Sequence, residues 1–148
     1  MSNLSYANRG GAICFVASKM DIANVATKVE TNAAIDYSID GIMYEATTNT
    51  GITLTGDTQE KDTECLYLVS VNAAGTFAVT KGEEQLTTDL EKEGKGLHWP
   101  DLPAASAAVG AFKIVTVAVV FVPATTALSA SGVTDTYYDL ATVPSATV

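Results

Sequence analysis

The chain has 148 residues, of which 47% are apolar and 17% are charged, and its formal net charge is −9. This length fits one domain, and the apolar content excludes an acidic disordered chain, whose hydrophobicity would be low. The 8 Lys and Arg residues against 17 Asp and Glu residues argue against polyanionic partners, because clustered basic residues are needed to bind nucleic acid or anionic membranes. We therefore expect no nucleic-acid partner and no membrane partner.

The longest apolar stretch, residues 114–122, has about half the length that a bilayer-spanning helix needs. The first residues lack the basic-then-apolar order of a secretory signal. The two cysteines, Cys14 and Cys65, lie far apart in the sequence, and their spacing leaves open whether they pair. A protein made and kept in a reducing cytoplasm is the simplest interpretation.

Residues 1–24 show no sustained alternation of apolar and polar side chains. Small and polar residues up to Gly11 precede an apolar patch that contains Ile13, Phe15 and Val16. We predict that residues 1–24 form an extended N-terminal arm with one strand at most, and that residues 25–148 form a β-rich domain. Ordering such an arm costs conformational entropy, which contact with a partner would offset.

From residue 25 the side chains alternate, in runs over residues 25–29, 35–39, 42–46 and 52–54. Asp40 and Gly41 separate two of these runs and predict a tight hairpin turn, since Gly accepts a positive φ. Residues 65–71 and 76–80 predict a second hairpin, and the polar residues 58–64 before it predict a loop.

In the second half of the chain, the spacing of Leu86 and Leu90 predicts a short helix within residues 83–93, capped by Gly94. Residues 97–103 predict an extended linker, residues 104–110 fit a helical turn or a loop, and residues 112–122 and 133–140 predict a last strand pair. The predicted fold class is all-β: one compact antiparallel β-sandwich or barrel with short hairpins and an N-terminal arm.

Few residues have the pattern of a catalytic or metal site. A nucleophile needs a base beside it, and most such bases are histidines. His98 is the single histidine, and nothing in the spacing indicates that it lies beside Cys14 or Cys65. Both cysteines occur in apolar runs, where Cys usually acts as a small hydrophobe. No zinc motif occurs, and the acidic residues within 57–64 lack the order of a calcium loop and predict a solvated one. We expect no enzyme activity, no cofactor and no metal.

Trp99 is the aromatic residue that the sequence leaves freest for contact, because alternation places most tyrosines partly inside the sheet. It fits a sugar-binding platform, a lid over one end of a barrel, or a contact between subunits.

Six short motifs stand in a fixed order along the chain: YSIDG at 37–41, GTFAVTKG at 75–82, LP at 102–103, GAFKI at 110–114, FVPATTAL at 121–128 and GVTDTYYD at 132–139. This series resembles small virion proteins of tailed bacteriophages, especially head decoration (cement) proteins, over residues 25–144. The resemblance implies a β-rich fold, no catalysis, and symmetric binding of an assembled capsid, often as trimers. The implied partners are the major capsid protein and further copies of the chain, and the implied location is the capsid surface of the virion, after synthesis in the host cytoplasm.

A head-fibre or tail-associated module that binds a receptor or glycan fits the same motifs, and a small hydrolase is a third hypothesis. The arm and the Thr- and Ala-rich residues 122–132 are least explained by a self-contained core, so they are either contact surfaces or ordinary coil. The candidate capsid or subunit contacts are Ile13, Phe15, Val16, Trp99, Pro123, Thr125 and Thr126.

Overall fold

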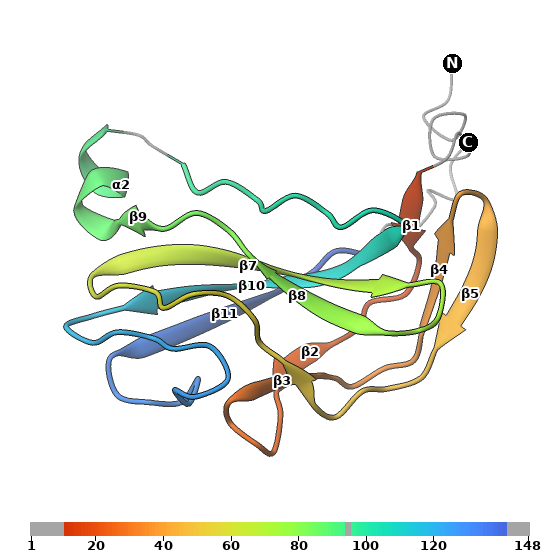
Figure 1. Cartoon of the computed structure of the whole chain (residues 1–148), viewed down its shortest axis with the longest axis horizontal. Helices are drawn as coiled ribbons and strands as arrows, with labels where there is room; N and C mark the ends of the chain where they lie inside the picture. The colour runs from red at the N-terminus through yellow and green to blue at the C-terminus, as the bar shows by residue number, and fades with distance from the viewer. Residues whose placement is uncertain (1–10, 94–95, 142–148) are drawn as a thin grey trace.

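The computed structural model describes residues 11–93 and 96–141. Over these residues the chain is nearly all β, in three antiparallel sheets that pack in a sandwich-like arrangement (Figure 1), so the predicted fold class is confirmed. The strands are β1 (Ala12–Cys14), β2 (Met20–Ile22), β3 (Lys28–Thr31), β4 (Ile35–Ile39), β5 (Ile42–Ala46), β6 (Ile52–Thr53), β7 (Thr63–Asn72), β8 (Phe77–Lys81), β9 (Gln85–Leu86), β10 (Ser106–Thr116) and β11 (Val133–Asp139), and the helix is α2 (Thr87–Glu93). Within the described residues, no helix has the length and apolar character needed to cross a membrane.

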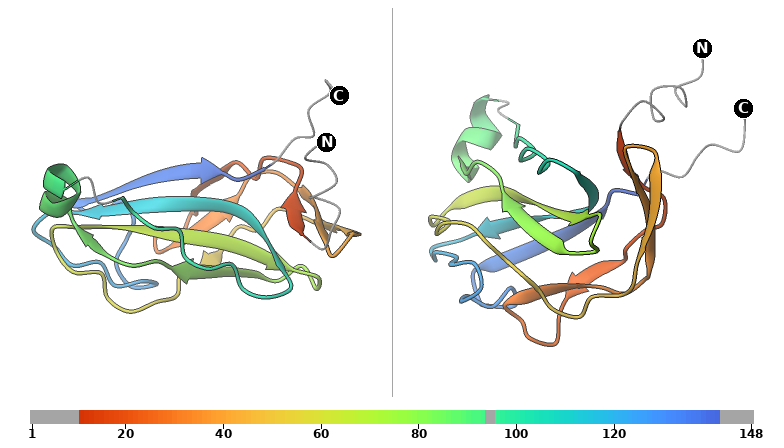
Figure 2. Two further views of the ribbon diagram at one scale, coloured as in Figure 1. Left: turned by 90° about the horizontal axis from the view of Figure 1, so that it is seen from above. Right: turned by 45° about the vertical axis from the view of Figure 1, so that its right-hand side comes forward.

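The largest sheet has the order β11-β10-β7-β8, and β9 pairs with the start of β7. The small sheet β2-β3-β6 packs on one of its faces and encloses the main core cluster. The sheet β1-β4-β5 stands at one end of the domain (Figure 2), where it packs a second core cluster against the ends of β7 and β10. The two longest strands, β7 and β10, therefore contribute to both clusters.

An aromatic ladder crosses the main core. Tyr67 of β7 lies opposite Phe112 of β10, and Phe112 lies opposite Tyr137 of β11. The Tyr67 and Phe112 rings stack with centroids 5.0 Å apart, Tyr137 adds a tilted contact at 5.9 Å, and Phe121 meets Tyr67 edge-on at 6.4 Å. Such cross-strand aromatic pairs stabilise one register of a sheet over its alternatives.

Both predicted hairpins form. The β4–β5 turn is Asp40-Gly41, with φ values of 51° and 81°, which are the two positive values that a type I′ turn requires. The β7–β8 hairpin turns at residues 73–76, where the Asn72 side chain accepts the N–H groups of Ala74 and Thr76. Local turn chemistry therefore accounts for both connections.

The structure differs from the expected arm at residues 11–24. β1 pairs with β4 and β2 pairs with β3, and Cys14 and Met20 are buried in the two core clusters. Each of these strands has only three residues, too few to show an alternation in the sequence. Residues 1–10 of the expected arm lie outside the described residues.

The strand expected over residues 112–122 begins and ends earlier in the structure. β10 runs from Ser106 to Thr116 and includes most of the segment that fitted a turn or loop. A β-bulge between Ala108 and Gly110 interrupts its register, and a bulge of this kind breaks the period-two pattern. The apolar residues that follow belong to a connection, in which Ala118 takes a φ of 58°.

The helix predicted within residues 83–93 is confirmed for its second half, since α2 begins at Thr87 and ends at Glu93. Gln85 and Leu86 form β9 instead. The expected cap, Gly94, lies outside the described residues.

The loop expected over residues 58–64 contains a fully buried side chain, Gln59. Its amide donates to the carbonyl oxygens of Ile114 at 3.0 Å and Thr63 at 3.3 Å, and its Oε1 accepts the Tyr67 hydroxyl at 3.2 Å. Gln59 and Phe121 also exchange main-chain hydrogen bonds of 2.8 and 2.9 Å. Burial raises the pKa of Tyr67, so its hydroxyl stays protonated and remains a donor.

The two core tyrosines provide a stability test. Tyr67→Phe leaves the buried Gln59 Oε1 without its donor, and we expect the free energy of unfolding to fall by about 1–3 kcal/mol. The Tyr137 hydroxyl is buried and makes no hydrogen bond of ordinary geometry among the described residues, although the nearby Asp135 carboxylate adds to the effect of burial in raising its pKa, so we expect Tyr137→Phe to lower stability less than Tyr67→Phe does. Denaturant unfolding of both variants measures the difference, and equal losses would contradict the assigned hydrogen bond.

Candidate interaction surface

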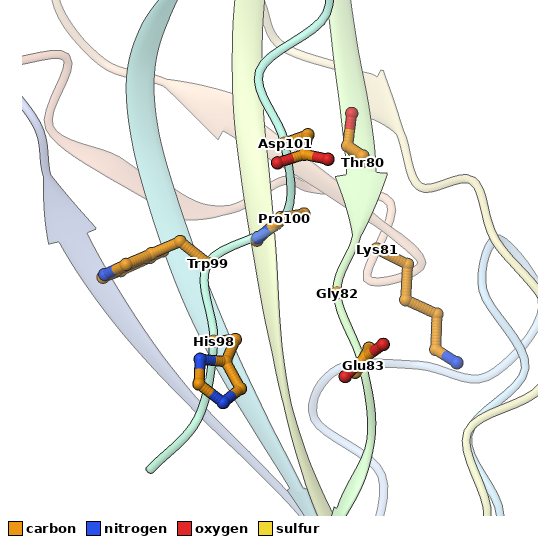
Figure 3. Close-up of a pocket in the computed structure, with 8 residues that line it drawn as sticks. All are labelled: Thr80, Lys81, Gly82, Glu83, His98, Trp99, Pro100 and Asp101. Atoms are coloured by element: carbon orange, nitrogen blue, oxygen red, sulfur yellow. The ribbon is translucent and has the colours of Figure 1, made fainter.

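Residues 97–103, named the strap here, lie over the large sheet on the side away from the main core (Figure 3). The strap passes close to Gly82 at the end of β8: a Cβ added to Gly82 would lie 2.8 Å from the Leu66 carbonyl oxygen and 3.2 Å from the His98 carbonyl oxygen. Only a residue without a side chain lets the two segments approach in this way. Gly82 therefore sets the position of the strap.

Trp99 leaves the strap on the side of β10 and β11 (Figure 3) and is 52% exposed. Its ring meets the ring of Tyr138 edge-to-face, with centroids 6.2 Å apart and an interplanar angle of 86°. Tyr138 is itself 37% exposed. Edge-to-face packing holds both rings while leaving much of each in water, so the outer face of the sheet presents a fixed aromatic pair.

A cleft of about 530 Å³ lies along the junction of the strap and the end of β8. Thr80, Glu83, His98 and Asp101 contribute its polar groups, and Pro100 contributes apolar surface. Asp101 and Glu83 lie toward β8, whereas the Trp99 ring extends to the opposite side (Figure 3). The exposed aromatic pair and the acidic cleft are therefore neighbours on one surface.

Lys81 also borders this cleft, but its ammonium group is paired with acidic residues of the chain. Its ammonium contacts the carboxylates of Asp57, at 2.9 Å, and Glu84, and its side chain is only 7% exposed. Burial alone would lower the pKa of Lys81, but Glu84 and Asp57 raise it above its ordinary value. Lys81 is therefore a charged clamp between β8 and the neighbouring loops rather than a free base.

The two thiols are poorly suited to nucleophilic chemistry. Cys14 and Cys65 are both buried and unpaired with each other. Burial raises the pKa of the Cys14 thiol, and it raises the pKa of the Cys65 thiol to about 11. Both therefore stay protonated near neutral pH, where a thiolate would be the nucleophile.

The acidic residues of the 57–64 segment diverge. Asp57 meets Lys81, Asp62 accepts the Ala118 N–H at 2.9 Å, and Glu64 lies 3.6 Å from Lys113. Within the described parts of the chain, no three His, Cys, Asp or Glu side chains converge as a metal site would require.

The predicted contact residues fall at three separate places. Ile13, Phe15 and Val16 are half-buried in and after β1, Trp99 lies in the strap, and the third group lies in the β10–β11 connection. In that connection Pro123 is buried, Thr125 is exposed, and Thr126 is half-buried with its hydroxyl accepting the Val122 N–H at 3.0 Å. β1 and the β10–β11 connection lie toward opposite ends of the domain (Figure 1).

Sequence reasoning missed three exposed residues. Tyr138 faces outward beside Trp99, and Ile42 and Met43 of β5 are 58% and 61% exposed. Two neighbouring residues of a strand point to opposite faces, so adjacent apolar residues such as Ile42 and Met43 already indicate that one of them faces away from the core.

No family model, curated protein or solved structure matches the chain.

A pair of glycine variants tests how the strap is held. We expect Gly82→Ala to force the strap away from β8, to lower the free energy of unfolding by about 1–3 kcal/mol and to shift the fluorescence of Trp99, the single tryptophan. Gly96→Ala is the control, because a Cβ there meets nothing within 4 Å. Denaturation and emission spectra measure both effects, and equal behaviour of the two variants would show that the strap does not depend on Gly82.

Proposed function

We propose that the protein is a non-enzymatic virion structural protein that binds the assembled capsid of a tailed bacteriophage and reinforces it as a decoration protein. The ordered motif series over residues 25–144 and the all-β fold that this resemblance implies support the proposal. The observation that carries it is the strap, which holds Trp99 half-exposed against Tyr138 on the outer face of the large sheet. A large aromatic side chain with a fixed position is typical of a residue that anchors a protein interface.

The composition suits this role. A net charge of −9 keeps separate copies soluble before a lattice is present. On an assembled capsid, many copies bind at fixed spacings, so modest contacts per copy add up to firm attachment. The major capsid protein is the proposed partner.

Co-sedimentation with heads that lack the native protein tests the proposal. We expect the purified chain to saturate these heads at a fixed number of copies and to raise the temperature at which they break open. Trp99→Ala is expected to weaken attachment by at least about tenfold, as loss of an aromatic anchor does. Val25→Ala, at an exposed residue of the β2–β3 connection, is the control and should bind as the wild type does.

Failure of the wild-type chain to bind any heads would contradict the capsid role. The second candidate is a receptor- or glycan-binding module of a fibre or tail, which the Trp99–Tyr138 pair and the neighbouring acidic cleft also favour. Quenching of Trp99 fluorescence by host-surface oligosaccharides, with no binding to heads, would favour this alternative.

A further inference from the structure

β5 has a strand on one side only. It pairs with β4, and no strand in the described parts of the chain pairs with its other edge. Other sheet edges are covered better, since β2 lies against β11, β6 against β8 and β1 against β10. The β4–β5 hairpin stands at the margin of the domain (Figure 2). β5 is therefore open to pairing with another strand.

The side chains of β5 do little to prevent such pairing. Ile42 and Met43 are more than half exposed, and Glu45 is the single charged residue of the strand. Edge strands that must stay unpaired usually carry several charges, a proline or a bulge. β5 has none of these, and its register against β4 is regular from Ile42 to Ala46.

The hairpin geometry shows which peptide groups face outward. In a two-residue turn the flanking residues, Ile39 and Ile42, form a hydrogen-bonded pair. Ile42, Tyr44 and Ala46 then direct their peptide groups toward β4, and Met43 and Glu45 direct theirs away from it. The main-chain bond from Phe15 to the Asp36 carbonyl oxygen, at 2.8 Å, agrees with this parity on the other side of β4.

We propose that β5 is a homodimerisation strand that pairs antiparallel with β5 of a second copy, about a two-fold axis at Tyr44. In this register Met43 lies opposite Glu45 of the second copy, and these two residues exchange main-chain hydrogen bonds. Ile42 lies opposite Ala46, and Tyr44 lies opposite Tyr44. The whole strand is then paired, and the interface is self-complementary, as a two-fold contact must be.

Charge selects this register over its neighbours. A shift by two residues in one direction places Glu45 opposite Glu45, which is unfavourable for like charges. The opposite shift leaves fewer residues paired. In the proposed register the acidic Asp40 of the turn lies opposite Thr48, so no two carboxylates lie opposite each other across the interface.

The pairing also continues the second core cluster across the axis. Tyr44 packs against this cluster and stacks on Tyr37, with centroids 5.6 Å apart. Ile42 shares the same face of the strand and would be covered by the second copy. The opposing force is the net charge of −9 on each copy, which salt screens, so dimerisation should strengthen as ionic strength rises.

This inference does not rest on capsid attachment, and a two-fold pair differs from the trimer that the resemblance implies. Light scattering and sedimentation of the full chain at about 0.1–1 mM, a range suited to a small interface, distinguish the states. We expect twice the chain mass of 15.4 kDa at high salt. A monomer or a trimer throughout this range would overturn the proposal.

Variants at Met43 locate the interface. Met43→Pro removes an outward N–H without removing a bond to β4, so we expect a folded monomer. Met43→Gln keeps this N–H and a side chain of similar length, and should still dimerise. Dimerisation of a folded Met43→Pro variant to the wild-type extent would show that β5 is not the interface.

A charge pair tests the register and holds even where the proline variant fails to fold. Met43→Lys places an ammonium opposite Glu45 of the second copy, whereas Met43→Glu opposes two carboxylates there. We expect the Lys variant to dimerise at least about tenfold more tightly than the Glu variant, because each of these contacts occurs twice. The same two substitutions at Val117, an exposed residue of the β10–β11 connection, control for net charge. An equal difference at both positions would overturn the proposed register.

Discussion

The aromatic ladder of Tyr67, Phe112 and Tyr137 is the contact on which the arrangement of the large sheet depends. It ties β7, β10 and β11 in one register, and successive residues of a strand point to opposite faces. One residue further along β11, Tyr138 therefore faces outward, opposite Ala111 of β10. A slip by one residue would turn Tyr138 into the core and remove the surface against which Trp99 packs. The outer aromatic pair is thus a consequence of the core register.

Two polar clamps complete this arrangement where regular strands end. Gln59 satisfies carbonyl groups of two strands and receives the Tyr67 hydroxyl, which joins an irregular segment to the core. Lys81 connects β8 with Asp57 and Glu84. Two acidic residues, the exposed Asp57 and the half-buried Glu84, are therefore paired with Lys81, while Glu83 and Asp101 remain exposed beside the strap.

The parts of the fold that the sequence predicts are those with local causes. Asp40-Gly41 specifies its own turn, and the alternation within residues 35–46 specifies the strands on either side of it. The strand-like runs over residues 65–71 and 76–80 predict the second hairpin. β1 and β2 escape prediction because three residues carry no period, and they are strands only because β4 and β3 lie beside them. The end of β10 escapes it because Val117 is apolar like a core residue and yet lies in an exposed connection.

The candidate surface shows the same division. Its central residue, Trp99, stands out in the sequence because it lies outside the alternating runs that contain most of the tyrosines. Its partner Tyr138 comes from a strand almost forty residues later, which only the fold brings close. The seven predicted contacts do not form one patch for the same reason. The measurement that tests the proposed role most directly is an electron cryomicroscopy reconstruction of heads incubated with the purified chain. We expect ordered density for this domain at symmetric positions on the capsid exterior, with the strap face in contact with the capsid. Heads without added density, or density confined to the tail or to fibres, would contradict that role.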